Sequence, residues 1–351
     1  MNIALIAFTK KGLETALNIA NNLPQHNSKT HVKGNFSINE GVAAVNKSLS
    51  SWIYDVFNSE DAVVFVGATG IAVRAIAPHL KNKFEDPAIV VVDEKGQYAI
   101  SLLSGHVGGA NDLAKEIADA IDATPIITTA TDINDCFSVD SWAKSQDMKI
   151  SDKNLTKMVS ANLLEGRKVG FITEVEIEGS LPEELVTEAC DINILISTKK
   201  NISSIINETI YANERILQLI PKTLVLGIGC RKGISENKIE KVVKTILKKE
   251  NISMDAITTI ASIELKKNEQ GLVGFCADHD IPFITYTATE LSEAKGSFTK
   301  SEFVNGVTGV DNVCERSAVM ASEDGLLIVP KQSMDGVTIA IARKERTYKW
   351  T

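Results

Sequence analysis

Short apolar runs alternate with segments of helical period over the first 135 residues of the chain. The helical period is clearest in residues 111–121, where Leu113, Ile117 and Ile121 fall on one face and charged side chains fall on the other. Continuous apolar runs that alternate with such helices predict a sheet covered on both faces. The predicted strands are residues 2–8, 62–66, 88–93, 98–103 and 125–130.

Residues 82–103 depart from this alternation. Two apolar runs there are joined by the short polar segment DEKGQ, with no room for a helix between them. Such a spacing predicts a hairpin, placed within the sheet or at its edge.

The pattern is less regular between residues 137 and 220. We interpret this part as a smaller α+β middle domain, with Pro221 at its boundary. It is expected to contain helices over 137–145 and 152–164 and strands over 168–174 and 192–198.

The alternation returns after residue 222. An apolar run enters a glycine turn, and Ser235 is the expected N-cap of a helix that carries Ile239 and Val243 on its apolar face. Strands are predicted over 223–230, 256–262, 282–286, 325–330 and 336–343, and a further helix begins near Asn268. The predicted fold class is therefore α/β, with two α/β domains of largely parallel sheets, residues 1–136 and 221–351, on either side of the middle domain, residues 137–220.

Composition narrows the class of protein. Hydrophobic residues make up 44% and charged residues 23% of the chain, which is typical of a globular protein. The apolar stretch at the N-terminus is too short for a signal peptide, and no window is long enough to span a membrane. The five cysteines are widely spaced and none forms a C-x-x-C pair, which argues against disulfides and structural zinc and favours the cytoplasm.

The formal net charge of −8 excludes a general attraction to nucleic acid. Any anionic ligand must therefore be bound locally. Backbone N–H groups at helix N-termini and a few positioned arginines and lysines are the means available.

The first candidate site is the stretch VFVGATGIAVRAIAPHL, residues 64–80. A strand ends at Val66, Gly67 and Gly70 open the turn, and a helix follows with Arg74 one turn inside it. Such a turn exposes N–H groups that suit a carboxylate or a phosphate, although the stretch matches neither phosphate-binding glycine fingerprint. The alternative is that the two glycines only allow tight packing of the helix on the strand.

The second candidate is AISLLSGHVGGANDLAKEIADAI, residues 99–121. His106 lies between Gly105 and the pair Gly108 and Gly109, where a strand passes into a helix. Ligands of open α/β sheets bind beyond the carboxyl ends of strands, and a near-neutral pKa suits histidine for acid–base work. A structural role for this histidine is the alternative.

The third candidate is PIITTATDIND, residues 125–135, where a strand enters a hydroxyl-rich turn. Thr129 and Thr131 can donate hydrogen bonds to ligand oxygens, and Asp132 can orient an imidazole. Thr131 and Asp132 are equally suited to capping the helix expected near residue 137.

The fourth candidate is GIGCRKGIS, residues 227–235. It opens like a dinucleotide-binding fingerprint, but Lys232 occupies the place of the third glycine, which argues against NAD. Arg231 and Lys232 suit an anionic ligand instead. Two later stretches add Lys266 and Glu315, and Glu315 stands in an otherwise small and apolar run that suggests a buried acceptor.

Taken together, these stretches resemble the cobalamin-biosynthesis protein G family, the cobalt-precorrin-5A hydrolases of the anaerobic corrin pathway. The resemblance covers almost the whole chain and is weakest in the middle. The matching stretches are GATGIAVRAIAPHLKNKFEDPAIVVVDEKGQYAISLLSGHVGGANDLA, PIITTATD, LVLGIGCRKG, IELKKNEQGL and GVDNVCERSAV.

The resemblance implies a reaction in which water opens a δ-lactone on a cobalt-bound macrocycle and a bridging carbon leaves as acetaldehyde. It implies no cofactor of the protein's own, because cobalt arrives as part of the substrate. The implied partner is this cobalt-tetrapyrrole rather than nucleic acid or membrane. Neighbouring enzymes of the corrin pathway and a second copy of the chain are further candidate partners.

Under this interpretation we assign acid–base catalysis to His106, and we expect Asp132 to orient His106 or to share its role. Ser104 and the amides of Gly108 and Gly109 are assigned to stabilising the oxyanion at the lactone carbonyl. Residues expected to contact the substrate are Gly67, Thr69, Gly70, Arg74, Lys83, Gly105, Gly108, Gly109, Asn111, Thr129, Thr131, Gly229, Arg231, Lys232, Lys266 and Glu315. Two alternatives are a non-catalytic carrier of corrin intermediates and a nucleotide-dependent enzyme that uses the turn at residues 227–233.

Overall fold

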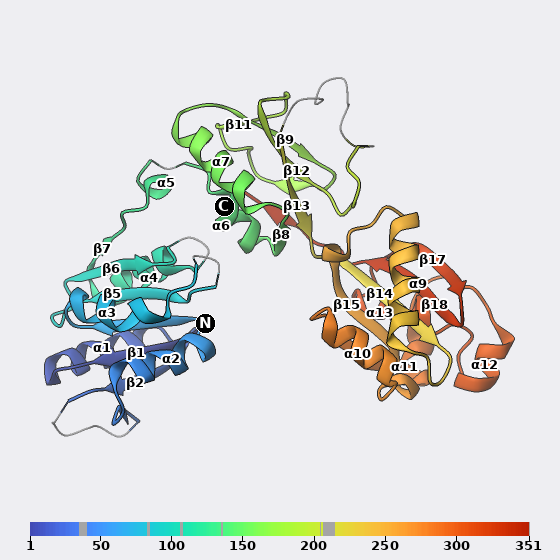
Figure 1. Ribbon diagram of the computed structural model, residues 1–351, viewed down its shortest axis with the longest axis horizontal. Helices are drawn as coiled ribbons and strands as arrows, with labels where there is room; N and C mark the ends of the chain where they lie inside the picture. Colours follow the sequence, from blue (N-terminus) through green and yellow to red (C-terminus); the bar gives the residue numbers. More distant parts are fainter. Residues whose placement is uncertain are drawn as a thin grey trace. The chain divides into compact units, whose positions relative to one another are not determined.

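The computed structural model describes residues 1–34, 41–82, 85–105, 108–134, 136–203, 205 and 215–350. The chain divides into two compact units, residues 1–141 and 142–351, and each is described by itself (Figure 1). The further division into three domains stays a prediction. The fold class is confirmed, because the strands form largely parallel sheets covered by helices.

The first unit contains a seven-stranded sheet in the order β3-β2-β1-β4-β5-β6-β7. The strands are β1 (Asn2–Ala7), β2 (Asn27–Val32), β3 (Ala43–Ala44), β4 (Ala62–Val66), β5 (Ala88–Val92), β6 (Tyr98–Leu103) and β7 (Thr124–Ile126). The helices are α1 (Lys10–Asn22), α2 (Leu49–Ser59), α3 (Thr69–Ile76), η1 (Ala77–His79), α4 (Ala110–Ile121) and α5 (Ala130–Ile133), and α6 (Val139–Ser145) crosses the boundary between the two units.

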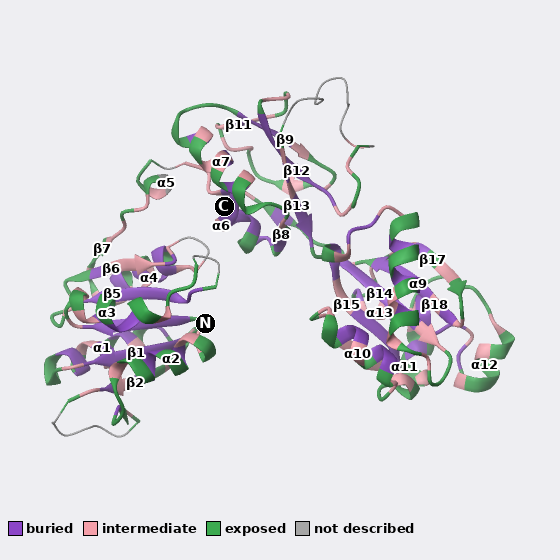
Figure 2. Cartoon of the chain, viewed as in Figure 1, coloured by how far each residue is buried: buried purple, intermediate pink, exposed green. Residues whose placement is uncertain are grey.

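Helices cover both faces of this sheet, as the continuous apolar strands predict. Successive side chains of β1 point to opposite faces, so that Ile3 and Leu5 pack with α1 and α4 while Ala4 and Ile6 pack with α2 and α3. Every residue of β4 and β5 is buried (Figure 2). The sheet is thus a rigid central layer from whose two ends the loops project.

The predicted hairpin is present and determines which end of the sheet each loop occupies. Strands β1 to β5 are parallel, but β6 pairs antiparallel with β5 and β7 runs parallel to β6. The register pairs Ile89, near the start of β5, with Leu103 at the end of β6. The carboxyl ends of β6 and β7 therefore lie at the edge opposite to the carboxyl end of β4.

The second unit begins with a five-stranded sheet in the order β11-β9-β12-β13-β8, parallel except for β8. Helix α7 (Lys153–Leu164) packs against it with the buried side chains of Val159 and Leu163. The strands are β8 (Met148–Ile150), β9 (Val169–Thr173), β11 (Leu185–Val186), β12 (Ile192–Ile196) and β13 (Arg215–Pro221). Strand β13 was not predicted.

The second unit continues with a sheet in the order β16-β15-β14-β18-β17. Strands β14, β15 and β16 are parallel, whereas β18 and β17 form the expected closing pair as an antiparallel hairpin. The strands are β14 (Leu224–Cys230), β15 (Ile257–Ile263), β16 (Phe283–Tyr286), β17 (Leu326–Met334) and β18 (Val337–Arg343). The helices are α9 (Glu236–Lys249), η2 (Met254–Ala256), η3 (Glu264–Lys266), α10 (Gln270–Asp278), α11 (Ala288–Glu293), α12 (Glu302–Thr308) and α13 (Cys314–Ala321).

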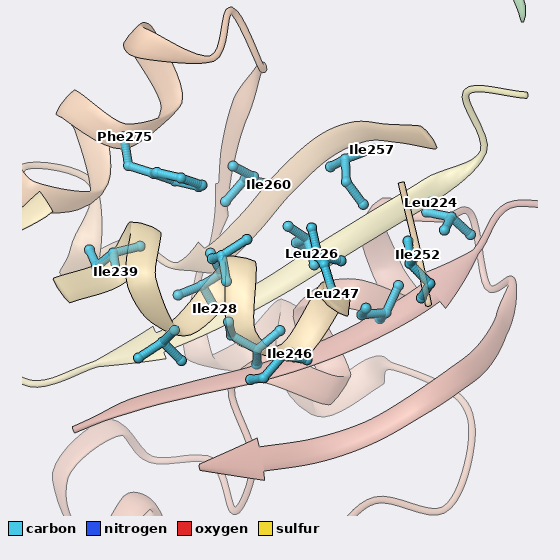
Figure 3. Close-up of a cluster of buried hydrophobic side chains, with 14 of the residues drawn as sticks. Leu224, Leu226, Ile228, Ile239, Ile246, Leu247, Ile252, Ile257, Ile260 and Phe275 are labelled. Atoms are coloured by element: carbon cyan, nitrogen blue, oxygen red, sulfur yellow. The ribbon is translucent and has the colours of Figure 1, made fainter. Parts of the chain in front are cut away.

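Strand β14 forms the middle of this second core. Leu224, Leu226 and Ile228 point to one face, where Figure 3 shows them packed with α9 and with Phe275 of α10. Ser235 is the N-cap of α9, as predicted. The opposite face of β14 is covered by α13.

The last residues of the chain form a separate two-stranded sheet of the second unit. Strand β19 (Tyr348–Lys349) pairs parallel with β10 (Ile177–Glu178). Among the described residues, no helix combines the length and the apolar character needed to cross a membrane.

Candidate functional site

The turn after β6 has a strained backbone held by its own hydrogen bonds. Ser104 has a φ of 56° and Gly109 a φ of 88°, both in the left-handed region. The N–H groups of Ala110 and Asn111 donate to the carbonyl oxygens of Ser104 and Gly105, at 3.1 and 3.0 Å. These first two amides of α4 are therefore used within the turn.

Glycine is required in this turn because the chain packs against itself. A Cβ added to Gly108 would lie 2.3 Å from Cβ of Ser104, and one added to Gly105 would lie 2.6 Å from Oδ1 of Asn111. Both distances are shorter than any real carbon contact. The two glycines thus bring Ser104 and Asn111 to the start of α4.

Asn111 connects three segments of the chain through its carboxamide. Its Oδ1 accepts a hydrogen bond from Oγ of Ser101 in β6, at 2.6 Å. Its Nδ2 donates to Oγ1 of Thr129, at 3.2 Å, and to Oδ2 of Asp132 in α5, at 2.8 Å. Asn111 is only 2% exposed, so this cluster of Ser101, Asn111, Thr129 and Asp132 is centred on a buried side chain.

Ser104 carries a buried hydroxyl whose hydrogen-bonding capacity is not used by the described part of the chain. The residue is 8% exposed, and its Oγ has no hydrogen-bond partner there. Burying a hydroxyl without a partner costs about 1–3 kcal/mol. An unused polar group at a glycine turn is the arrangement expected of a group that binds a ligand atom.

Three of the predicted residues are not fully described. His106 and Lys83 lie outside the described residues, as does the side chain of Thr131. The backbone of Thr131 and all of Asp132 belong to α5, so neither residue caps the helix that begins at Val139. The capping alternative is therefore wrong, because Thr129 is the N-cap of a separate short helix.

The turn that contains Gly67 and Gly70 lies at the other edge of the same sheet. It follows the carboxyl end of β4. The carboxyl end of β6 lies near the start of β5, so the length of the five paired residues of β4 and β5 separates the two ends. At about 3.3 Å per residue, the two turns are about 15 Å apart. The structure therefore does not bring Gly67, Thr69, Gly70 and Arg74 together with Ser104 and Asp132.

Arg74 is exposed and folds back on its own helix. Its Nη1 donates to the carbonyl oxygen of Gly70 at 3.4 Å, and among the described residues it pairs with no carboxylate. Gly67 lies against the ring of Phe8, 3.2 Å from the position of an added Cβ. At this edge, Gly67 therefore allows close packing against Phe8, and the exposed guanidinium of Arg74 is available to an anionic ligand.

In the second unit, the glycines of β14 serve packing. A Cβ on Gly227 would lie 1.8 Å from the carbonyl oxygen of Cys314 in α13, and one on Gly229 would lie 2.5 Å from Oγ1 of Thr338. These two glycines allow α13 and β18 to approach the strand. Their resemblance to a dinucleotide fingerprint therefore has a structural explanation.

Charged side chains gather where β14 and β15 end. Arg231 and Lys232 are exposed, and the half-buried Lys266 pairs with Glu269 at 2.9 Å. Glu269 also accepts a hydrogen bond from the N–H of Gly233 at 2.7 Å. Burial raises the pKa of the Glu269 carboxyl, but the bonds from Lys266 and Gly233 outweigh it and hold this pKa below its ordinary value.

Cys230 and Glu315 complete this part of the second unit. Burial raises the pKa of the Cys230 thiol, which disfavours a nucleophilic role. Glu315 is 1% exposed and is the buried acceptor that its apolar surroundings suggested. Its carboxylate accepts hydrogen bonds from the N–H and Oγ1 of Thr299, Nδ2 of Asn312 and the N–H of Lys331.

Sequence reasoning missed Ser101 as a member of a site. Ser101 interrupts an apolar strand on the side that faces α4, which is a detectable signal.

Three family models match successive parts of the chain. The model described as Cobalamin synthesis G N-terminal matches residues 51–132, and Cobalamin biosynthesis central region matches residues 137–221. Cobalamin synthesis G C-terminus matches residues 224–342. The three models together cover both clusters described above.

Curated proteins match over nearly the full length. A protein of Salmonella typhimurium named cobalt-precorrin-5A hydrolase is 33% identical over 350 residues, which are 97% of this chain and 97% of that protein. One of Priestia megaterium with the same name is 30% identical over 97% of this chain and 94% of its own. A crystal structure of a cobalamin biosynthesis protein G homolog from Sulfolobus solfataricus is 25% identical, covers 98% of this chain and 97% of that one, and has a TM-score of 0.43.

Proposed function

This chain belongs to the cobalamin synthesis G family, and we propose that it is the hydrolase that opens the δ-lactone of cobalt-precorrin-5A and releases acetaldehyde. The observation that carries this proposal is the match to two curated relatives of that name over 97% of the chain. The role in cobalamin biosynthesis follows from the family itself.

The proposed reaction consumes one water molecule. Water attacks the lactone carbonyl, the acyl C–O bond breaks, and the water oxygen remains in the new carboxylate. The freed hydroxyl then loses its proton and becomes the aldehyde oxygen as the C–C bond to the macrocycle breaks. The electron pair of that bond passes to the macrocycle, which takes up a proton. The protein must therefore supply a base, donors for the oxyanion and a proton relay.

The Ser104 turn offers groups suited to these tasks. The unused hydroxyl of Ser104 is a donor for the oxyanion at the lactone carbonyl, and Asp132 is a carboxylate for the acid–base steps. We assign the remaining proton transfer to His106, which belongs to the same turn in sequence. The N–H groups of Ala110 and Asn111 are used by the turn, so Ser104 and the amides of Gly108 and Gly109 are the oxyanion donors of this proposal.

The acidic side chains of the substrate need cationic partners on a protein of net charge −8. We assign this role to Arg74 of the first unit, which also contains Ser104 and Asp132, whereas Arg231 and Lys232 of the second unit stay predictions from the sequence. Arg74 lies at the sheet edge away from Ser104, so it is assigned to a substrate carboxylate remote from the lactone. Cobalt is part of the substrate in this proposal, and the chain supplies no metal of its own.

Anaerobic incubation of the purified chain with cobalt-precorrin-5A tests the proposal. We expect many equivalents of acetaldehyde per protein, together with a product whose mass corresponds to one water gained and one acetaldehyde lost. Binding of one equivalent without acetaldehyde would overturn the proposal in favour of a carrier.

A matched pair of variants tests the position of the site. Asp132→Asn should lower the turnover number about 10²-fold or more, because it removes an acid–base group. Asp119→Asn, at an exposed position of α4, should leave turnover unchanged. Equal turnover of the two variants would contradict the assignment of Asp132.

A further inference from the structure

We propose that Asn111 is a positioning residue of the reaction, and that it holds the Asp132 carboxylate and the Ser104 turn in one fixed arrangement. This inference rests on the proposed function. It changes the role expected from the sequence, in which Asn111 contacts the substrate. The observation that carries it is a single buried carboxamide bonded to β6 and to the segment that follows β7, two segments at the same edge of the sheet.

Both N–H donors of the Asn111 carboxamide are used within the chain. A primary amide has two N–H donors, and those of Asn111 are directed to Thr129 and Asp132. Its oxygen accepts the short bond from Ser101. With 2% of its surface exposed, Asn111 acts on the reaction through the groups it holds rather than by direct contact.

The groups that Asn111 holds include those with proposed chemical roles. Asp132 is 21 residues away in the chain and lies in a helix of only four residues, which has little rigidity of its own. The bond from Nδ2 therefore fixes the direction of this carboxylate. The oxygen of the same carboxamide lies against Gly105, so it also limits the movement of the turn that carries Ser104.

Asparagine is the residue type that this position requires. Aspartate would place a second carboxylate against Asp132, and leucine would remove the hydrogen bonds that Asn111 forms with the part-buried hydroxyl of Ser101 and with the Asp132 carboxylate. Alanine would remove all three bonds and open a space beside Gly105. Each change loosens the proposed catalytic group without touching the substrate.

The test compares the single variants Asn111→Ala and Asn111→Asp with the exchange variant Asn111→Asp/Asp132→Asn. The singles should lower kcat for acetaldehyde release about 10²-fold, with KM within threefold of the wild type, because the loss is one of geometry. The exchange restores an amide–carboxylate hydrogen bond with its polarity reversed. Its Tm should therefore recover to near the wild-type value while its kcat stays as low as that of Asp132→Asn.

If Asn111 and Asp132 as a pair had a purely structural role, kcat would recover together with Tm in the exchange variant. That outcome would overturn the inference, as would a kcat of Asn111→Ala within threefold of the wild type. Asn193→Ala is the matched control, because Asn193 is also a buried asparagine and, among the described residues, its side chain bonds only to the backbone of Cys190. It should lower Tm without changing kcat per folded molecule.

A further variant covers the case in which Asn111→Ala does not fold. Ser101→Ala removes only the bond to Oδ1 of Asn111 and leaves Asp132 in place. We expect a smaller loss of kcat, about 3- to 10-fold, and an unchanged kcat would contradict the inference. If the wild-type chain releases no acetaldehyde, both the proposed function and this inference fail. If the wild type and Asn111→Ala are equally active, only this inference is overturned.

Discussion

The indole of Trp350 stacks on the indole of Trp142, with ring centroids 4.7 Å apart and planes inclined by 19°. Phe171 of β9 packs edge-on against both rings. Nε1 of Trp142 donates to the carbonyl oxygen of Lys349 at 2.9 Å. Aromatic packing therefore fixes the end of the chain to the first sheet of the second unit, and β19 also pairs with β10 in a separate two-stranded sheet.

Replacing Trp350 with alanine should destabilise the second unit by about 1–3 kcal/mol, because it removes a stacked, half-buried aromatic ring. Urea unfolding measures the change. Tyr54→Ala, at an aromatic residue that is 61% exposed, is the control and should change stability by less than about 0.5 kcal/mol. Equal stability of the two variants would show that the stacked pair contributes nothing.

Adding one methyl group at Gly108 should disrupt the turn after β6. The new Cβ in Gly108→Ala would lie 2.6 Å from the carbonyl oxygen of Ser104, so the backbone must shift at a cost of about 1–3 kcal/mol. Acetaldehyde release should fall with it. Gly306→Ala in α12 is the control, since no atom lies within 4 Å of its added Cβ, and there alanine should stabilise by about 0.5–1 kcal/mol. A fully active Gly108→Ala enzyme would contradict this account of the turn.

Most strands of the first sheet could be predicted from sequence because they are continuous apolar runs, whereas the polar strand β2, NSKTHV, and the two-residue strand β3 were missed. Strands β1, β4, β5 and β6 agree with the predicted runs to within one residue at each end. Strand β7 ends at Ile126, earlier than predicted, because Thr129 instead caps a short helix. Strand β13 was missed because its sequence, RILQLIP, follows a polar stretch and carries Gln218 at its centre.

The arrangement of the candidate site could be predicted only in part. Glycines and polar residues identified the Ser104 turn and the Asp132 segment separately, but the Asn111 bonds join residues 10, 18 and 21 positions apart. Nothing local to any one of them indicates these contacts. The opposite placement of Gly67 and Ser104 follows from the antiparallel hairpin, a long-range consequence of a short polar turn.

Glu315→Gln should destabilise the second unit by about 2–4 kcal/mol. One carboxylate oxygen accepts a hydrogen bond from the N–H of Thr299 and the other from the N–H of Lys331. The NH₂ group of glutamine would replace one of these oxygens and would then stand opposite an N–H donor, so one hydrogen bond is lost. Chemical denaturation measures the loss. Glu323→Gln, at an exposed residue, should have almost no effect. Similar values for both would show that the buried bonds of Glu315 are not needed.

The thiol of Cys276 should make stability depend on pH in alkaline solution. Burial raises its pKa from 9.0 to about 12 in the folded chain, so above pH 9 the unfolded chain loses this proton while the folded chain keeps it. This contribution to stability is complete below pH 9 and is lost as the pH rises toward 12. Cys276→Ala should therefore show a shallower fall in unfolding free energy between pH 9 and 10.5 than the wild type. Parallel curves would contradict the prediction.

Ser104→Ala should separate stability from activity. Because the buried Oγ of Ser104 has no partner among the described residues, its removal relieves a desolvation cost, and the free energy of unfolding should stay the same or rise by about 1 kcal/mol. If this hydroxyl donates to the oxyanion, the same variant should lose about 10²-fold in kcat. Ser59→Ala, at an exposed serine of α2, should change neither quantity. A destabilised but fully active Ser104→Ala enzyme would mean that the hydroxyl serves the fold. A buried group that is kept for catalysis lowers the free energy of unfolding, so its removal should raise this free energy.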